Sequence, residues 1–178
     1  MSVNTSFLSE LKAAIREVPD FPKPGINFFD ITTVLQRGDL FHGLNQHLSE
    51  HYRAMNIDAV VGIESRGFIF ASALADRLHC GFVPIRKPKK LPWKTFSVSY
   101  QLEYGADTIE IHQDALTKGQ RILLVDDLLA TGGTMAAALE LVRKFEVEIV
   151  DLVFLIELGF LGGREKLPNV SINSLLTY

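Results

Sequence analysis

Two adjacent carboxylates, Asp126 and Asp127, separate a run of apolar residues, 122–125, from a stretch of small residues, 130–134. Crowded neighbouring carboxylates disfavour joint ionisation, so we expect a cationic or hydroxyl-rich partner beside them. The small stretch consists of Ala130, Thr131, Gly132, Gly133 and Thr134. Its backbone N–H groups can converge at the start of a helix, and its glycines leave no Cβ to block a ligand. The combination is suited to holding a phosphate monoester.

Neither common nucleotide fingerprint occurs in this stretch. It lacks the terminal Gly-Lys-Ser/Thr of the nucleotide-binding loop and the Gly-x-Gly-x-x-Gly spacing of dinucleotide-binding proteins. An ordinary strand-to-helix turn is the alternative interpretation of the glycines alone. The paired carboxylates favour a binding site.

A second apolar run, 58–63, ends in Glu64-Ser65-Arg66-Gly67, and a helix is expected from 68 to about 79. Strand ends that meet on one side of a parallel sheet are where α/β proteins bind ligands. Arg66 has a planar fork suited to phosphate oxygens, and Ser65 lies among further helix-start amides. A surface salt bridge is the alternative for Arg66.

A basic segment follows a short strand expected over 82–85. It contains Arg86, Lys87, Lys89, Lys90 and Lys94. Such a run is often only a solvated charged face. Prolines at 88 and 92 stiffen it, however, so some of these cations could neutralise a bound or departing anion.

The rigid loop 20–30 contains prolines, a glycine and four apolar residues, for which we expect no regular structure. Such a loop can present backbone groups to a flat heterocycle, or its aromatic residues can simply fill the core. Residues 96–102 alternate between apolar and polar types, and so do residues up to 112. We therefore expect a hairpin lid over 94–112, with Glu103 and Tyr104 at its tip.

The elements that position these residues alternate between strand and helix from 58 to 158. This order predicts an α/β fold with a central, mainly parallel sheet and helices on both faces. Apolar spacing also predicts helices over 7–18 and 40–55, a strand over 149–158 and an edge strand over 170–176. His47 and His51 have zinc-binding spacing, but without a third ligand we interpret them as part of a solvated helix face.

The composition is that of an ordinary globular protein, with 178 residues, 47% apolar residues and a net charge of −3. We expect one domain, formed by residues 1–178, with an N-terminal helix and hood over 1–35. The charge gives no bulk attraction to nucleic acid or membranes. A single cysteine, Cys80, and the lack of a signal-like start or a membrane-length apolar run predict a soluble, cytoplasmic protein.

The stretch from 121 to 134 resembles the signature of the type I phosphoribosyltransferases for phosphoribosyl pyrophosphate (PRPP). The resemblance implies that Asp126 and Asp127 contact the ribose, directly or through water and Mg²⁺, and that residues 130–134 hold the 5′-phosphate. It further implies that Ser65 belongs to the pyrophosphate loop, near a cis peptide at 64–65, and that Arg86, Lys87 and Lys90 face the pyrophosphate.

Two further segments resemble the adenine phosphoribosyltransferases: the hood from Phe21 to Thr32 and the hairpin sequence Ser-Tyr-Gln-Leu-Glu-Tyr-Gly over 99–105. The implied adenine-binding residues are Ile26, Asn27, Phe28, Arg66 and Leu128. Glu103 would be the proton-handling group, with Arg66 also at the reaction centre. One departure is Phe29, because family members usually carry a basic residue there.

The family activity is salvage of adenine with PRPP to give AMP and pyrophosphate, with Mg²⁺ as cofactor and a homodimer as the usual assembly. A 6-oxopurine transferase is the nearest alternative, but such enzymes usually place an aspartate where this chain has Leu129-Ala130. A PRPP-sensing regulator that binds nucleic acid would need a basic face or an extra domain. We expect neither nucleic acid nor membrane as a partner.

Overall fold

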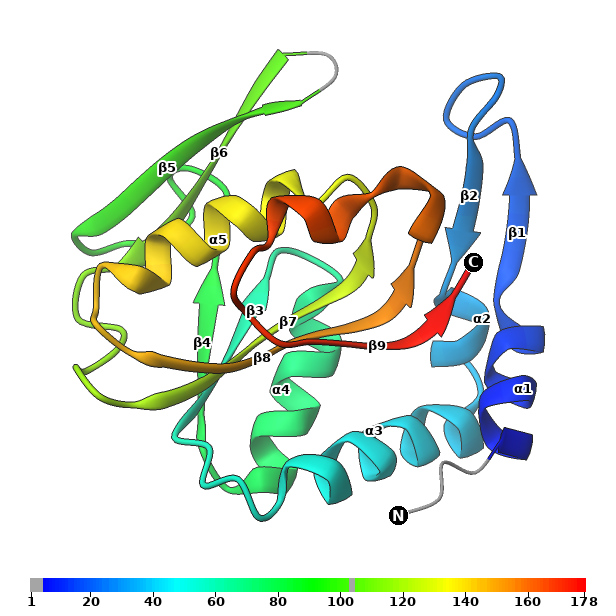
Figure 1. The fold of residues 1–178 in the computed structure, drawn as a ribbon, viewed down its shortest axis with the longest axis horizontal. Coiled ribbons are helices and arrows are strands. Elements are labelled where there is room, and N and C mark those ends of the chain that lie inside the picture. The colour runs from blue at the N-terminus through cyan, green and yellow to red at the C-terminus, as the bar shows by residue number, and fades with distance from the viewer. Residues whose placement is uncertain (1–4, 103–104) are drawn as a thin grey trace. The chain divides into compact units, whose positions relative to one another are not determined.

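The computed structural model describes residues 5–102 and 105–178 of the chain. Within it, the chain forms two compact units, residues 1–48 and residues 49–178. Figure 1 gives the order of the helices and strands. Within the described residues, no helix is long and apolar enough to cross a membrane.

The first unit contains a short helix and a hairpin where a longer helix and an irregular loop were predicted. Helix α1 (Thr5–Ala14) ends four residues early, because the chain then forms β1 (Arg16–Pro19). Strand β1 pairs antiparallel with β2 (Asn27–Asp30), and this pairing satisfies backbone groups that a helix would otherwise have to satisfy. The prediction of no regular structure over 20–30 was therefore wrong at its end, because the prolines at 22 and 24 lie before β2 rather than in it.

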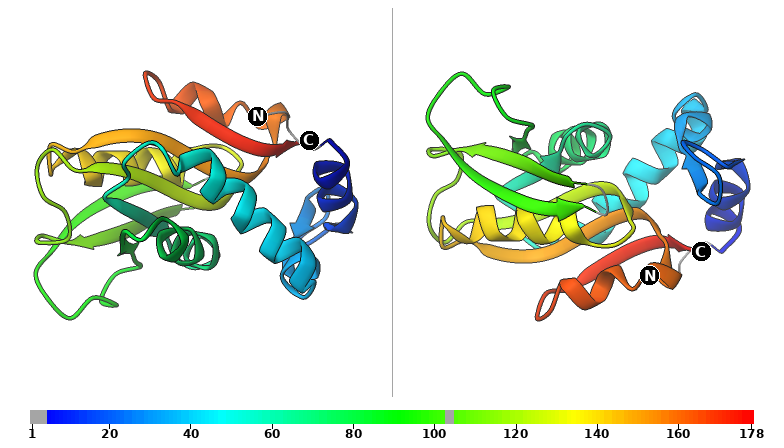
Figure 2. Two further views of the ribbon diagram at one scale, coloured as in Figure 1. Left: turned by 90° about the horizontal axis from the view of Figure 1, so that it is seen from below. Right: turned by 90° about the horizontal axis from the view of Figure 1, so that it is seen from above.

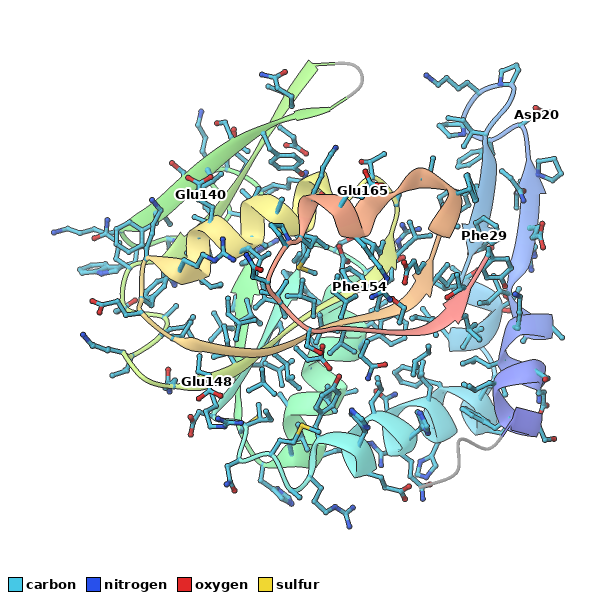
Figure 3. The ribbon with its side chains drawn as sticks, viewed as in Figure 1. Asp20, Phe29, Glu140, Glu148, Phe154 and Glu165 are labelled. Carbon is cyan, nitrogen blue, oxygen red and sulfur yellow. The ribbon has the colours of Figure 1, made fainter. Side chains whose placement is uncertain are left out.

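Phe29 lies in this hairpin, opposite Glu17 in the strand pairing. The residue, labelled in Figure 3, is only 5% exposed. An apolar residue therefore occupies a buried position in this hairpin. Short helix α2 (Thr32–Leu35) and most of α3 (Gly38–Tyr52) complete the unit.

The second unit is built on a five-stranded parallel sheet, as predicted. Its strands are β3 (Ala59–Ile63), β4 (Gly81–Ile85), β7 (Arg121–Leu129), β8 (Glu148–Glu157) and β9 (Ile172–Thr177). Their order is β4-β3-β7-β8-β9, and every neighbouring pair is parallel. Strand β9 lies at an edge, as expected for the last strand.

Helices cover both faces of this sheet (Figure 2). A Cβ added to Gly62 in β3 would lie 2.7 Å from that of Ala71, so α4 (Gly67–Leu78) packs closely on the Gly62 face. Val61 and Ile63 point to the other face, because side chains alternate along a strand. They join a buried cluster with residues of α5 (Gly133–Arg143) and of the hairpin.

The hairpin consists of β5 (Thr95–Leu102) and β6 (Gly105–His112), which pair antiparallel in the predicted region. Val98, Ile109 and Ile111 belong to the buried cluster with α5. The hairpin therefore rests on the core through its base. The chain after β8 forms two short 3-10 turns, Gly159–Leu161 and Gly163–Lys166, which lead to β9.

Candidate active site

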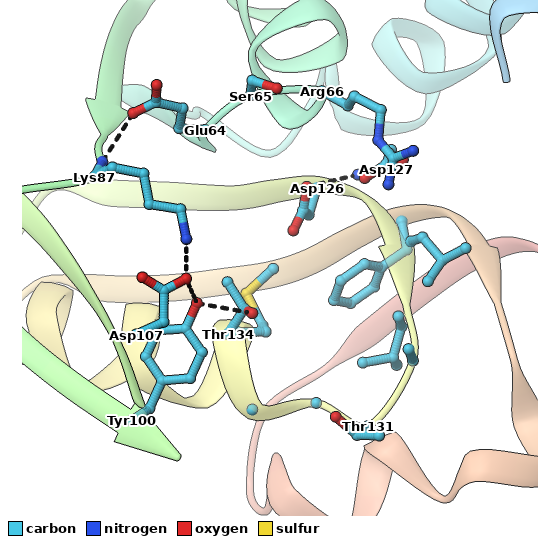
Figure 4. A pocket seen from close by; sticks show the side chains of 17 residues that line it. Glu64, Ser65, Arg66, Lys87, Tyr100, Asp107, Asp126, Asp127, Thr131 and Thr134 are labelled. Atoms are coloured by element: carbon cyan, nitrogen blue, oxygen red, sulfur yellow. Dashed lines mark hydrogen bonds and ion pairs between the residues drawn. The ribbon is translucent and has the colours of Figure 1, made fainter. Parts of the chain in front are cut away.

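A pocket of about 600 Å³ opens where β3 and β7 run into the helices that follow them (Figure 4). Its lining comes entirely from the second unit. The lining residues are Glu64, Ser65, Arg66, Lys87, Tyr100, Asp107, Asp126, Asp127, Leu128, Leu129, Ala130, Thr131, Gly132, Gly133, Thr134, Met135 and Phe154. The two strand ends predicted to share a site are therefore brought together.

Asp126 and Asp127 lie within β7 rather than after it, because the strand pairs with β8 as far as Leu129. The apolar run 122–125 is therefore only the first part of a longer strand. The longer strand holds both carboxylates on a rigid element. Asp127 is 4% exposed, and its Oδ2 lies 2.8 Å from Nε of Arg66, while Asp126 Oδ1 accepts a hydrogen bond of 2.9 Å from the Asp127 amide.

The electrostatics of this pair favour a cationic or hydrogen-bond-donating ligand. Burial, reinforced by the neighbouring charge of Asp127, raises the pKa of Asp126 well above its usual range. Burial also raises the pKa of Asp127, although the Arg66 guanidinium opposes the shift. A ligand that donates hydrogen bonds or brings positive charge would relieve this crowding.

The loop 130–134 leads into helix α5, as predicted. Gly132 caps the N-terminus of α5 with a φ of 77°, a left-handed conformation that favours glycine. A Cβ on Gly132 would lie 2.4 Å from the carbonyl oxygen of Gly163, and a Cβ on Gly163 would lie 2.2 Å from that of Ala130. The turn around Gly163 therefore packs backbone to backbone against the loop. Sequence reasoning assigned this turn no part in the site.

The second strand end also carries the expected features. The peptide bond between Glu64 and Ser65 is cis, as the resemblance implied. Glu64 accepts two hydrogen bonds of 3.2 Å from the guanidinium of Arg86 and one of 2.8 Å from the backbone amide of Lys87. The hydrogen bond from Arg86 holds the pKa of Glu64 below its ordinary value, so this carboxylate stays ionised and anchors the start of the basic segment.

Sequence reasoning missed Asp107 and Tyr100, which face the pocket from the hairpin. Asp107 Oδ2 pairs with Nζ of Lys87 and accepts a hydrogen bond of 3.3 Å from Tyr100 Oη. Tyr100 Oη in turn accepts one of 3.2 Å from Thr134 Oγ1. A signal was available, because Asp107 interrupts the apolar side of β6 formed by Ile109 and Ile111.

Among the predicted residues that the structure describes in the second unit, Arg86 and Lys90 are not part of the pocket lining. Arg86 and Lys90 lie beside it in the basic segment, where Arg86 Nη1 donates to the Lys90 carbonyl at 3.4 Å. Ile26, Asn27 and Phe28 belong to the first unit, where Asn27 and Phe28 lie on β2 and Ile26 is the residue before it. Glu103 and Tyr104 lie outside the described residues.

The described residues contain no group of three or more His, Cys, Asp or Glu side chains arranged for a metal ion. Mg²⁺ is usually held by one or two carboxylates together with substrate oxygens and water, so a complete protein cage is not required. Asp126 and Asp127 are adjacent carboxylates at the pocket, and this donor set fits such a partial site.

Comparison with known proteins identifies the family to which the chain belongs. A family model described as the phosphoribosyl transferase domain matches residues 30–169. The adenine phosphoribosyltransferase of Acidobacterium capsulatum is 60% identical over 94% of this chain and 93% of its own length. That of Solibacter usitatus is 56% identical over 96% of this chain and 99% of its own.

Solved structures give the same result. The adenine phosphoribosyltransferase of Thermoanaerobacter pseudethanolicus superposes with a TM-score of 0.92 at 48% identity, covering 96% of this chain and 99% of its own. The Saccharomyces cerevisiae enzyme, in complex with adenine and an imino-altritol bisphosphate, superposes with a TM-score of 0.91 at 43% identity. It covers 96% of this chain and 99% of its own.

Proposed function

The chain belongs to the adenine phosphoribosyltransferases, and we propose that its pocket transfers the phosphoribosyl group of PRPP to adenine, giving AMP and pyrophosphate. One observation carries the assignment of the site. The loop 130–134 and the carboxylates of Asp126 and Asp127 line a single pocket with Arg66 and Lys87. That pocket offers amides for a phosphate, acceptors for ribose hydroxyls and cations for a pyrophosphate.

PRPP would bind with its 5′-phosphate on the loop and its ribose on the two aspartates. The amides of the loop and the hydroxyls of Thr131 and Thr134 would donate to the phosphate oxygens. The pyrophosphate would meet Ser65 and Lys87 in the pocket, with Arg86 and Lys90 nearby in the basic segment. These assignments combine the pocket geometry with the resemblance of the motifs.

Adenine would be recognised by backbone groups around Ile26 and Asn27, by the ring of Phe28, and by Leu128 and Arg66. In the first unit, Phe28 packs edge to face with Phe21 at a centroid distance of 5.2 Å. Asp20 Oδ1 accepts a hydrogen bond of 2.7 Å from the Gly25 amide, which holds the loop before β2 in shape. A rigid loop of this kind is suited to reading the edge of a flat base.

In the reaction, N9 of adenine attacks C1′ of PRPP while the bond from C1′ to the pyrophosphate oxygen breaks, with inversion at C1′. Glu103 would exchange the N7 proton of the purine during the attack. Arg66 and Lys87, with Arg86 and Lys90, would stabilise the negative charge that develops on the departing pyrophosphate. The hairpin β5-β6 would act as a lid that keeps water from the reacting sugar.

Mg²⁺ is proposed as the cofactor, held by Asp126 or Asp127 together with oxygens of the substrate. When bound, it would neutralise pyrophosphate charge and orient the pyrophosphate for departure. Residues 1–178 would serve as one functional domain, with residues 1–35 supplying the base-binding hood. We also expect a homodimer in the cytoplasm, with no nucleic-acid or membrane partner.

A direct test compares product formation from adenine, hypoxanthine, guanine and orotate, each with PRPP and MgCl₂. We expect AMP from adenine and at least a hundredfold lower rates with the other three bases, because a site that pairs with the 6-amino group leaves buried groups unpaired when the base lacks it. Comparable turnover of hypoxanthine or guanine would favour a 6-oxopurine transferase. Binding of PRPP without turnover of any base would favour a sensing protein.

A further inference from the structure

We propose that Asp107 is a built-in competitor for the pyrophosphate group: its carboxylate holds Lys87 in the substrate-free protein and must release it when PRPP binds. The proposal rests on the function proposed above, in which Lys87 binds pyrophosphate. It adds a residue of the hairpin to the groups that set substrate affinity.

The carboxylate of Asp107 is held in place from several sides. Its Oδ1 accepts a hydrogen bond of 2.8 Å from the Thr108 amide, while Oδ2 meets Lys87 Nζ and Tyr100 Oη. The side chain is only 27% exposed, and it points into the pocket toward Lys87 (Figure 4). Asp107 therefore presents an anionic oxygen at the place where the ammonium group of Lys87 is found.

Two other charged residues of the pocket lining, Arg66 and Glu64, have partners of their own. Arg66 pairs with Asp127, and Glu64 pairs with the guanidinium of Arg86. Asp107 is thus the carboxylate that neutralises Lys87 among the described residues of the pocket. A pyrophosphate brought to Lys87 would have to replace Asp107 as the partner of this ammonium group, so the energy of the existing ion pair is lost on binding.

Both partners are ionised at neutral pH. The hydrogen bond from Lys87 holds the pKa of Asp107 below its ordinary value, although burial opposes the shift. Burial lowers the pKa of Lys87, but its hydrogen bond to Asp107 and the negative charge of Asp107, with a further contribution from Tyr100, outweigh burial, and the net shift is upward. The competition is therefore between two anions for one cation, without a proton transfer.

Release of Lys87 would not detach the hairpin from the rest of the unit. The amide of Arg86 donates to the Glu110 carbonyl at 2.9 Å, and the Glu110 amide donates back at 2.7 Å. This backbone bridge lies three residues from Asp107 and does not involve its side chain. Replacing the carboxylate should consequently change ligand affinity without unfolding the hairpin.

The test is Asp107→Asn, which keeps the shape and the acceptor oxygen but removes the charge. Binding of inorganic pyrophosphate with MgCl₂ is measured by isothermal titration calorimetry on the full chain. We expect the Kd to fall about two- to tenfold, as the loss of a partly exposed competing ion pair implies. The gain should shrink as KCl rises from 50 mM to 0.5 M, because salt screens the competition.

Two further variants make the result specific. Asp114→Asn removes an equal charge from an exposed position after the same hairpin and should leave the Kd unchanged. In a Lys87→Met background, Asp107→Asn should no longer tighten binding, because the contested cation is gone. A gain that persists in that background would show a general charge effect and overturn the proposal.

The remaining outcomes separate this proposal from the function on which it rests. If the wild-type chain forms AMP but Asp107→Asn binds pyrophosphate equally or more weakly, Asp107 does not compete, and the proposal fails alone. If the wild-type chain neither forms AMP nor binds pyrophosphate, the proposed function fails and takes this inference with it.

Discussion

Asp127 combines three properties that are unusual together in one residue. It is almost fully buried, it adjoins a second carboxylate, and it forms an ion pair of 2.8 Å with Arg66. A carboxylate that served stability alone would not need a second acid beside it, since that neighbour opposes its ionisation. The arrangement is instead suited to accepting hydrogen bonds from ribose hydroxyls.

Replacing Asp127 with Asn should therefore weaken PRPP binding about 10- to 100-fold, as loss of a hydrogen bond to a charged group implies. The change also leaves Arg66 without this carboxylate. Titration calorimetry with PRPP and MgCl₂ measures the effect. Asp76→Asn, on the exposed side of α4, is a matched control with unchanged affinity expected. Unchanged affinity in Asp127→Asn would remove the ribose assignment.

Among single residues, the sequence was sufficient to identify those site residues that are neighbours along the chain. Asp126, Asp127 and the loop after them are consecutive, so their shared role could be inferred without a structure. The apolar side of β6 singles out Asp107, but its partners could not be inferred from the sequence, because they depend on pairing across the hairpin with Tyr100 and on the proximity of Lys87. Contacts between separate segments are set by register and packing, which a local pattern does not contain.

At the scale of elements, the loop 130–134, for which we propose phosphate binding, packs against the turn Gly163–Lys166. The turn is held by Arg164, whose guanidinium donates two hydrogen bonds of 2.6 Å to Glu157 at the end of β8. Gly163 then lies against the loop so closely that an added Cβ would be 2.2 Å from the Ala130 carbonyl oxygen. The loop is thus shaped from outside as well as by its own glycines.

Gly163→Ala should displace the loop and raise the KM for PRPP about tenfold, with a smaller effect on the KM for adenine. Overpacking of this kind also lowers the free energy of unfolding by about 1–3 kcal/mol. Gly38→Ala is a suitable control, because nothing lies within 4 Å of its added Cβ. Steady-state kinetics and urea unfolding separate the two effects. Equal increases in both KM values would argue against a role specific to the phosphate loop.

The elements differ in how well the sequence predicted them. All five strands of the sheet were identified, and apolar runs such as 59–63 and 122–125 are a strong signal for buried parallel strands. The N-terminal region was harder to predict. Residues 16–18 continue a helical spacing, yet they form part of β1 because β2 offers a hydrogen-bonding partner. Tertiary pairing decided the structure where the local preference was weak.

At the scale of the whole molecule, the alternation of strands and helices was sufficient to predict the sheet and its coverage. The continuation of β7 through the two aspartates was not predicted, because charged residues normally indicate the end of a buried strand. The chain tolerates them there because the strand end faces the pocket. The strand whose length the sequence did not predict is therefore the strand that carries the candidate site. Such exceptions are expected where residues are selected for function and not for folding.

Long-range order in the second unit depends in part on a buried polar group that is separate from the pocket. Tyr52, at the end of α3, is 1% exposed, and its Oη donates to Asp151 Oδ2 on β8 at 2.8 Å. The same oxygen accepts a hydrogen bond of 2.8 Å from Asn173 on β9. One hydroxyl thus joins three elements that are far apart in the chain.

Tyr52→Phe should lower the free energy of unfolding by about 1–3 kcal/mol at pH 7, because a buried carboxylate loses its donor.

Burial, and then the charge of Asp151, raises the pKa of Tyr52 in the folded chain. Above about pH 10, the unfolded chain loses this proton while the folded chain keeps it, so wild-type stability declines. Tyr52→Phe lacks this decline. Urea unfolding between pH 7 and 11 should therefore show the gap between the two proteins narrowing above pH 10, by up to about 1.4 kcal/mol per pH unit. A gap that stays constant with pH would mean that Tyr52 ionises as readily in the folded chain as in the unfolded one.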